Sequence, residues 1–288
     1  MLGLVYSYAM LKSIIRRIVR SLGYEVRRRA STASSVKGLE RASLEGSLTQ
    51  VRDTGGAPAT VIDVGAAIGS FSRQCHEIFP NAQYLLIEPL NEYVSCLDKT
   101  VKAIPRASYE IAVASSCDNP VTINVHPDLV GSSLYRETES GTDVNGFPRV
   151  VNAITLDRLV KERDAHPPYF IKIDVQGAEL DVLRGGEATL CGAELVLLEV
   201  SLFQFFKEGP LFFDVVTYMK SKGFVPHDIL GLQYRPLDHA LSQVDIVFVP
   251  ENGPLRRFHY YATPEQRLQQ NREFRSHLQQ ILALDQVS

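Results

Sequence analysis

Four ionisable residues lie in or next to two consecutive predicted strands. The segment Phe170–Glu179 contains Lys172, Asp174 and Glu179, and Glu199 comes at the end of the next apolar run. Strand alternation places Lys172 and Asp174 on the same side of the backbone. Carboxylates that converge with a lysine indicate proton abstraction, a bound divalent metal, or both. The structural alternative is a capping network, since Glu179 falls in the first turn of a predicted helix.

A glycine turn forms a second feature. The apolar run Thr60–Val64 leads into Gly65–Gly69, and a helical pattern follows from Ser70. Glycines and Ala66 let a ligand approach the backbone, and the first turn of the helix offers free N–H groups. Asp63, at the end of the strand, could bind a cationic amine or order the loop. The same turn also occurs in α/β proteins for reasons of geometry alone.

An acid also ends the next predicted strand, in the segment Leu85–Glu88. Adjacent strand ends of an open α/β sheet meet at its ligand-binding edge, where a carboxylate can accept both hydroxyls of a ribose. The glycine turn and Glu88 together therefore favour a nucleoside-containing cofactor. The Gly-x-Gly-x-x-Gly fingerprint of dinucleotide sites is absent, and no Lys-Ser/Thr pair follows the glycines. A nicotinamide-dependent oxidoreductase and a non-catalytic binding module remain the alternatives.

These residues must be positioned by alternating strands and helices. Such alternation implies right-handed crossovers and a mainly parallel sheet with helices on both faces. The predicted strands are Thr60–Val64, Gln83–Glu88, Ser108–Val113, Tyr169–Asp174, Glu194–Val200 and a terminal pair. The predicted helices are Ser70–Phe79, Asn91–Ala103, one from Ala178 and one near Phe212–Lys222. We expect Ala114–Pro168 to be an insertion over one end of the sheet, with a strand at Val121–Val125 and a short helix capped by Thr155.

Composition narrows the class of protein. The chain has 288 residues, of which 45% are hydrophobic and 22% charged, and its net charge is −3. That charge does not complement nucleic acid, so we expect no nucleic-acid partner. The four cysteines are isolated, which fits a reduced, cytoplasmic setting and offers no metal-ligand spacing. We predict an N-terminal extension over residues 1–58, a main domain over 59–260 and a helical tail over 261–288.

The N-terminal extension has two parts. Residues 11–29 show helical spacing of apolar residues, with seven cations at Lys12, Arg16, Arg17, Arg20, Arg27, Arg28 and Arg29. Such a helix can lie on an anionic membrane surface, as a peripheral contact at its cytoplasmic face, or pack on the protein's own core. Residues 30–58 are rich in Ser, Thr, Ala and Gly, which predicts a linker.

The motifs together resemble those of the FkbM family of methyltransferases, from about Thr60 to Val249. The motifs that carry the resemblance are the Asp-Val-Gly-Ala-x-Ile-Gly turn at 63–69, Glu88-Pro89, Gly131-Ser132-Ser133, Thr155-Leu156-Asp157, Lys172-Ile-Asp-Val-Gln-Gly-Ala-Glu179 and Val244-Asp245. The Lys-Ile-Asp-Val-x-Gly-Ala-Glu segment is the specific part. One position departs from the family pattern: Ala67 stands where the family commonly has asparagine.

The resemblance implies a class I methyltransferase fold with a seven-stranded, Rossmann-like sheet. It implies S-adenosylmethionine as cofactor and methyl transfer to a hydroxyl of a sugar, glycolipid or related small molecule, as in glycan biosynthesis. Asp63, Gly65 and Gly69 would then hold the methionine end of the cofactor, and Glu88 its ribose. Asp174 would lie at the methyl-transfer edge with Glu179 beside it. Ala114 and Ser115 would lie near the adenine.

Overall fold

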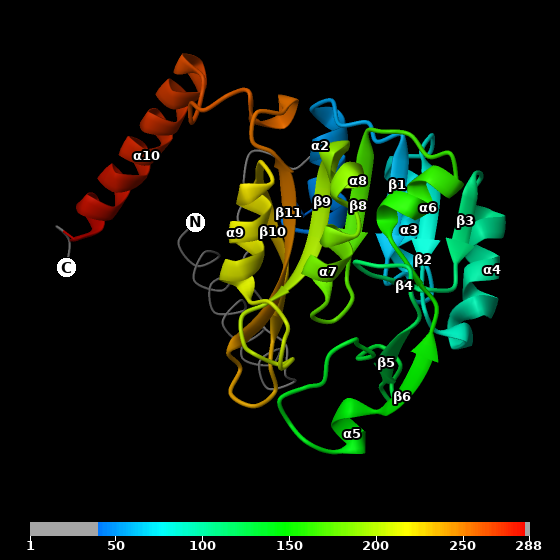
Figure 1. The fold of residues 1–288 in the computed structure, drawn as a ribbon. Helices are drawn as coiled ribbons and strands as arrows, with labels where there is room; N and C mark the ends of the chain where they lie inside the picture. Colours follow the sequence, from blue (N-terminus) through cyan, green and yellow to red (C-terminus); the bar gives the residue numbers. More distant parts are fainter. Residues whose placement is uncertain (1–39, 286–288) are drawn as a thin grey trace. The chain divides into compact units, whose positions relative to one another are not determined.

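The computed structural model of the chain describes residues 40–285. Its centre is a seven-stranded sheet in the order β10-β11-β9-β8-β1-β2-β3 (Figure 1). The strands are β1 (Thr60–Val64), β2 (Gln83–Ile87), β3 (Ala107–Glu110), β8 (Tyr169–Ile173), β9 (Ala193–Ser201), β10 (Phe224–Tyr234) and β11 (Leu241–Pro250). β3, β2, β1, β8 and β9 pair in parallel, whereas β11 runs antiparallel to both of its neighbours. The predicted mainly parallel, seven-stranded sheet is confirmed.

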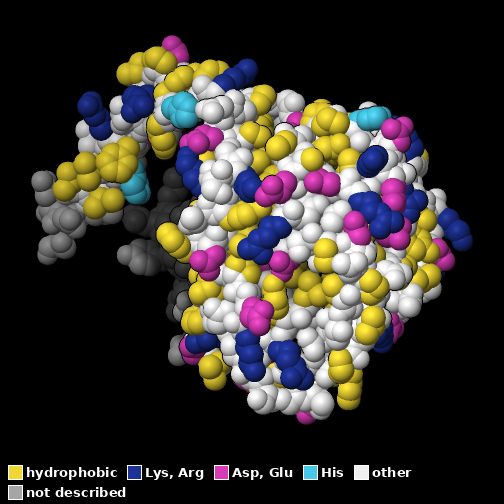
Figure 2. Space-filling model, in the orientation of Figure 1, with side chains coloured by type: hydrophobic (Ala, Val, Ile, Leu, Met, Phe, Trp, Pro, Cys, Tyr) yellow, Lys and Arg dark blue, Asp and Glu magenta, His cyan; other side chains and the backbone are white. Residues whose placement is uncertain are grey.

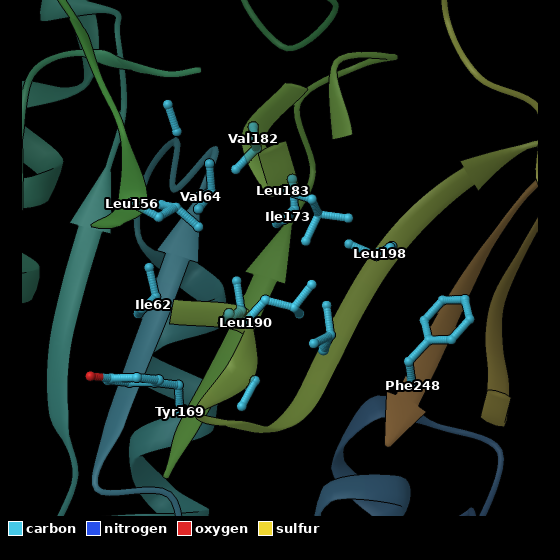
Figure 3. Close-up of a cluster of buried hydrophobic side chains, with 14 of the residues drawn as sticks. Ile62, Val64, Leu156, Tyr169, Ile173, Val182, Leu183, Leu190, Leu198 and Phe248 are labelled. Carbon is cyan, nitrogen blue, oxygen red and sulfur yellow. The ribbon is translucent and has the colours of Figure 1, made fainter. Parts of the chain in front are cut away.

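Helices cover both faces of the sheet, as predicted, because the side chains of the buried strands alternate between two cores. Ile62 belongs to one core and Val61 to the other. The first core, shown in Figure 3, contains residues of α6 (Leu156–Glu162), α7 (Glu179–Arg184), α8 (Glu187–Cys191) and α9 (Phe212–Ser221). The second contains residues of α2 (Leu44–Asp53), α3 (Ser70–Ile78) and α4 (Val94–Ala103), which follows the short helix η2 (Asn91–Tyr93).

The predicted insertion is present, beyond the edge of the sheet where the parallel strands end (Figure 1). It contains the antiparallel pair β5 (Val121–Val125) and β6 (Phe147–Val151), the short helix α5 (Thr142–Asn145) and the strand β7 (Ala153–Ile154). Thr155 caps α6, as predicted, by accepting a hydrogen bond from the Arg158 N–H at 3.3 Å. The single strand predicted over Ser108–Val113 is wrong, because β3 ends at Glu110 and Val113 starts β4 (Val113–Ala114), which pairs with β7.

The linker predicted over residues 30–58 is wrong for its second half. There α2 begins after Ser43, whose hydroxyl accepts the Gly46 N–H at 3.1 Å. Leu48 and Val51 are fully buried in the second core. Leu44 packs at the edge of the same core, and the Ser47 hydroxyl donates to Asp228 of β10. Because few of the residues of α2 are apolar, its periodicity is hard to detect. The predicted basic helix at 11–29 lies outside the described residues.

The C-terminal part of the chain continues from η3 (Pro254–Arg256) into α10 (Pro264–Asp285). The residues of α10 whose side chains are described are exposed. Figure 2 shows hydrophobic, basic and histidine side chains next to one another along it. In the part of the chain that the structure describes, no helix is long and apolar enough to cross a membrane.

Candidate active site

A pocket opens at the carboxyl ends of β1, β2 and β8, with about 720 Å³ of empty space. One wall comes from the loops after the three strands and includes Gly65, Glu88 and Asp174. The insertion supplies the opposite wall, which includes Ile123 and Ser133.

The glycine turn after β1 has the backbone that the sequence predicts. Gly65 and Gly69 have φ values of 72° and 73°, in the left-handed region that favours glycine. A Cβ on Gly65 would lie 1.9 Å from the Asp174 carbonyl oxygen, so no other residue fits there without movement. Ala67, the departure from the family pattern, also has a positive φ, of 45°, and lines the pocket. The turn therefore brings its backbone directly against the pocket.

Asp63 lies beneath the glycine turn and is fully buried. Its Oδ2 accepts a hydrogen bond from the Ser72 hydroxyl at 2.7 Å, and its Oδ1 lies 3.4 Å from Lys172 Nζ. It is not on the pocket wall. Ser72 of α3 and Lys172 enclose its carboxylate. Of the two roles that the sequence left open for Asp63, these contacts are those of a residue that orders the loop.

Lys172 is 8% exposed and joins three parts of the site. Its Nζ donates to the Gly65 carbonyl at 2.8 Å, lies 3.4 Å from Asp63 Oδ1 and lies 3.5 Å from Asp174 Oδ2. Burial alone would lower the pKa of this ammonium group, but the two carboxylates outweigh burial and raise it. Lys172 therefore holds the glycine turn through the Gly65 carbonyl, and it is not on the pocket wall.

Glu88 lines the pocket at the end of β2 and is 4% exposed. Its Oε2 accepts the Ala67 N–H at 2.8 Å and its Oε1 accepts the Leu90 N–H at 3.0 Å. Burial raises the pKa of this carboxyl group above its usual range, against the effect of these two backbone donors. Because each carboxylate oxygen has a second lone pair, both can still accept a hydroxyl hydrogen. Glu88 thus shapes the turn and faces the pocket.

Asp174 is the most accessible of the predicted catalytic acids, with a side chain that is 41% exposed. It lines the pocket directly after β8, beside Gly65. One oxygen faces Lys172, and the other accepts a hydrogen bond from Gln176 Nε2 at 3.2 Å. An ionised carboxylate with free lone pairs and an opening to the pocket can accept a proton from a ligand.

Glu179 and Glu199 are brought near Asp174 but have different surroundings. Glu179 is 3% exposed and accepts the Gly177 N–H at 2.9 Å, so it holds the loop before its own helix. Burial raises its pKa to about 7. Glu199 accepts hydrogen bonds from three side-chain amides. Burial, together with the nearby charges of Asp174 and other carboxylates, raises the pKa of Glu199 to about 8. Neither is on the pocket wall, so Asp174 is the acid placed to touch a ligand.

Of the remaining predicted cofactor residues, one is on the pocket wall and the others are not. Ala114 is on the pocket wall, in an apolar stretch that suits a flat aromatic base. Ser115 is not, because its N–H donates to the Ile154 carbonyl and its own carbonyl lies against Gly185. Ala66, Gly69 and Ser70 also lie off the wall. Ala66 donates its N–H to the Ile87 carbonyl at 3.1 Å, and Gly69 packs against α4.

Sequence reasoning missed part of the wall. Tyr93, Leu129 and Gln176 line the pocket, and none of them was expected there. The Gly131-Ser132-Ser133 motif was a usable signal for the insertion, since both serines are on the wall. Among residues 40–285, no group of three or more His, Cys, Asp or Glu side chains is arranged to hold a metal ion.

Comparisons with known proteins agree with this geometry. The family model described as the methyltransferase FkbM domain matches residues 63–226, which is more than half of the chain. A search of curated protein sequences finds no match.

Solved structures of methyltransferases are similar at low identity. FkbM methyltransferase from Methylobacillus flagellatus is 16% identical, with a TM-score of 0.40 over 65% of this chain and 43% of that chain. The chain therefore spans less than half of that relative's length. Fibrillarin from Aeropyrum pernix, solved with S-adenosylmethionine, is 13% identical, with a TM-score of 0.40 over 67% of each chain. A putative RNA methyltransferase from Pyrococcus horikoshii is 12% identical, with a TM-score of 0.40 over 72% of this chain and 82% of that chain.

The sheet with its antiparallel β11, the pocket at the ends of β1, β2 and β8, and the matched family model lead to one assignment. The chain belongs to the FkbM methyltransferase family.

Proposed function

We propose that the protein transfers the methyl group of S-adenosylmethionine to a hydroxyl group of a sugar, a glycolipid or a related small molecule. The observation that carries this proposal is the position of Asp174, a half-exposed carboxylate on the wall of the pocket beside the glycine turn. Glu88 and the backbone of Gly65 and Ala67 line the same pocket and suit a nucleoside-containing cofactor. S-adenosylmethionine supplies an electrophilic methyl group on a positively charged sulfur.

The reaction asks little chemistry of the protein beyond alignment and the removal of one proton. The acceptor oxygen forms a bond to the methyl carbon while the carbon–sulfur bond breaks, and the hydroxyl proton passes to the Asp174 carboxylate. The released thioether is neutral. Lys172 Nζ lies 3.5 Å from Asp174 Oδ2 on the side away from Gln176. An alcohol becomes a competent nucleophile only as its proton leaves, so a base at this position is the main requirement.

The sugar-like acceptor is proposed from the family resemblance, and two aromatic side chains after β9 bear on it. Phe203 and Phe205 have ring centroids 6.1 Å apart, and aromatic faces suit the apolar side of a sugar ring. Neither ring is on the pocket wall, and the Arg235 guanidinium lies over the Phe203 ring at 3.8 Å.

The test is a methyl-transfer screen with labelled S-adenosylmethionine against free sugars, nucleotide sugars and lipid-linked glycans. Label on a hydroxyl oxygen of one class supports the proposal, whereas label on amines only would contradict it. A chelator arm addresses a divalent metal: proton abstraction by Asp174 predicts full activity, and a metal-assisted reaction predicts loss. A parallel titration with NAD and S-adenosylmethionine separates this proposal from an oxidoreductase. A protein that binds the cofactor but transfers no label would be a binding module.

The basic segment 11–29 lies outside the described residues, and its two alternatives predict different results. As a membrane contact, it should bind anionic phospholipid vesicles at low salt and release them at high salt, with about 1 kcal/mol per engaged cation. As part of the core, its deletion should lower the melting temperature and leave vesicle binding unchanged. Vesicle sedimentation with the full chain and with residues 30–288 separates these outcomes.

A further inference from the structure

Gln176 has an unusual backbone conformation for its position on the pocket wall. Its φ is 55°, in the left-handed region that residues other than glycine rarely adopt, and Gly177 follows with a φ of 95°. A strained residue of this kind persists only where its surroundings hold it, and such residues cluster at functional sites. The question is therefore what holds Gln176 and what Gln176 holds.

Its side-chain amide connects two carboxylates. Nε2 donates to Asp174 Oδ1 at 3.2 Å and to Glu199 Oε2 at 2.8 Å, which uses both hydrogens of the amide. Glu199 is itself fixed from two other directions, by Gln243 Nε2 at 3.0 Å and by Gln233 Nε2 at 2.9 Å. The Gln176 amide is therefore anchored on Glu199, and from this fixed position it donates to Asp174.

Its backbone is held by the insertion. The Ser133 hydroxyl, which is buried, donates to the Gln176 carbonyl at 2.6 Å. On the other side, a Cβ on Gly177 would lie 2.8 Å from the ring of Phe206, so the loop has little room to move. The loop after β8 is thus held between the insertion and the segment after β9.

The charges around Asp174 explain why a neutral amide suits this position. Asp63 from β1, Glu179 from α7, Glu199 from β9 and Asp245 from β11 all lie near enough to interact electrostatically with Asp174. Lys172 is the cation that opposes them. An amide can contact two carboxylates without adding a charge, whereas an acid at the same position would add one more.

We propose that Gln176 is a positioning residue for methyl transfer, which orients Asp174 toward the acceptor by bridging it to Glu199. The proposal rests on the role of Asp174 proposed above. Gln176 itself takes no part in bond making. Its loss would leave Asp174 held by Lys172 alone and free to turn away from the acceptor hydroxyl.

The first test is Gln176→Leu, which keeps the size and removes the amide. We expect kcat to fall about 10- to 100-fold, the effect of misplacing a reacting group by about 1 Å, with a smaller change in KM for S-adenosylmethionine. The matched control is Gln233→Leu, which removes an amide from Glu199 but has no contact with Asp174. That variant should stay within about threefold of the wild type, as ordinary surface substitutions do. Equal losses in both variants, or wild-type kcat in Gln176→Leu, would overturn the proposal.

The second test is Gln176→Glu, which also serves if the leucine variant does not fold. A further carboxylate between Asp174 and Glu199 favours proton uptake by the cluster, so the acidic limb of the pH–rate profile should move up by about one unit. An unmoved profile would show that the side chain at position 176 does not lie against the base, and that result would contradict positioning.

Asp174→Asn separates this proposal from the proposed function. If it turns over at the wild-type rate, the proposed role of Asp174 fails. If it is inactive while Gln176→Leu is fully active, only the role of Gln176 fails.

Discussion

Asp63 and Asp174 both lie next to Lys172, but their surroundings differ. Beneath the glycine turn, Asp63 and Lys172 are buried, and their polar atoms contact Ser72 and backbone carbonyls. At the rim, Asp174 is half exposed and opens to the pocket. Asp63 lies inside β1, one residue before its end, and Asp174 directly follows β8, so the two acids differ both in their depth along the sheet and in what covers them. A carboxylate enclosed by a helix orders the loop, and one left open can react.

The comparison predicts that the buried group contributes mainly to stability. Lys172→Met leaves the Asp63 carboxylate buried without its cation, which should cost about 3–5 kcal/mol of unfolding free energy. Denaturant unfolding measures this cost. The control Lys102→Met removes an exposed lysine from α4 and should change stability little. Adding Asp63→Asn to Lys172→Met should recover part of the loss. A Lys172→Met protein as stable as the wild type would show that the pair contributes nothing.

Glu88 shares one property with each of these acids. It is buried, as Asp63 is, and it lines the pocket, as Asp174 does. Glu88→Ala should weaken S-adenosylmethionine binding by about 1.5–3 kcal/mol, the range for hydrogen bonds to a charged group. Isothermal calorimetry measures the affinity, and Glu77→Ala, an exposed acid on α3, is the control. Unchanged affinity in Glu88→Ala would remove Glu88 from the cofactor site and leave it only its contacts with Ala67 and Leu90.

The smallest expected effect is a pH dependence of stability. Burial raises the pKa of Glu179 to about 7, so its ionisation costs more in the folded state than in the unfolded state. The contribution of protonated Glu179 to the free energy of unfolding is fully present below the ordinary pKa of glutamate. It is lost as the pH rises through about 7. Between pH 6 and pH 8 the loss should be about 1 kcal/mol. Melting curves of the wild type and Glu179→Gln at several pH values should therefore diverge, with the wild type falling more steeply. Parallel curves would contradict this burial effect.

Much of this arrangement follows from the sequence. Periodicity located the strands, and parallel strand ends meet at one edge, so Glu88 and Asp174 could be placed on the pocket. The roles of Asp63 and Lys172 could not be separated from that of Asp174, because the sequence does not show that Ser72 of α3 covers Asp63. Gln176 was missed because its contacts come from Ser133 and Glu199, which are distant in the chain. Helix α2 was missed because few of its residues are apolar.

Turnover of Asp174→Asn with saturating S-adenosylmethionine, measured beside Asp63→Asn, is the most direct test of this division. The account predicts that Asp174→Asn loses turnover by about 100-fold or more while it melts like the wild type and still binds the cofactor. Asp63→Asn should instead melt at a lower temperature, since Lys172 loses its buried partner. Wild-type turnover in Asp174→Asn would contradict the assignment of Asp174 as the base.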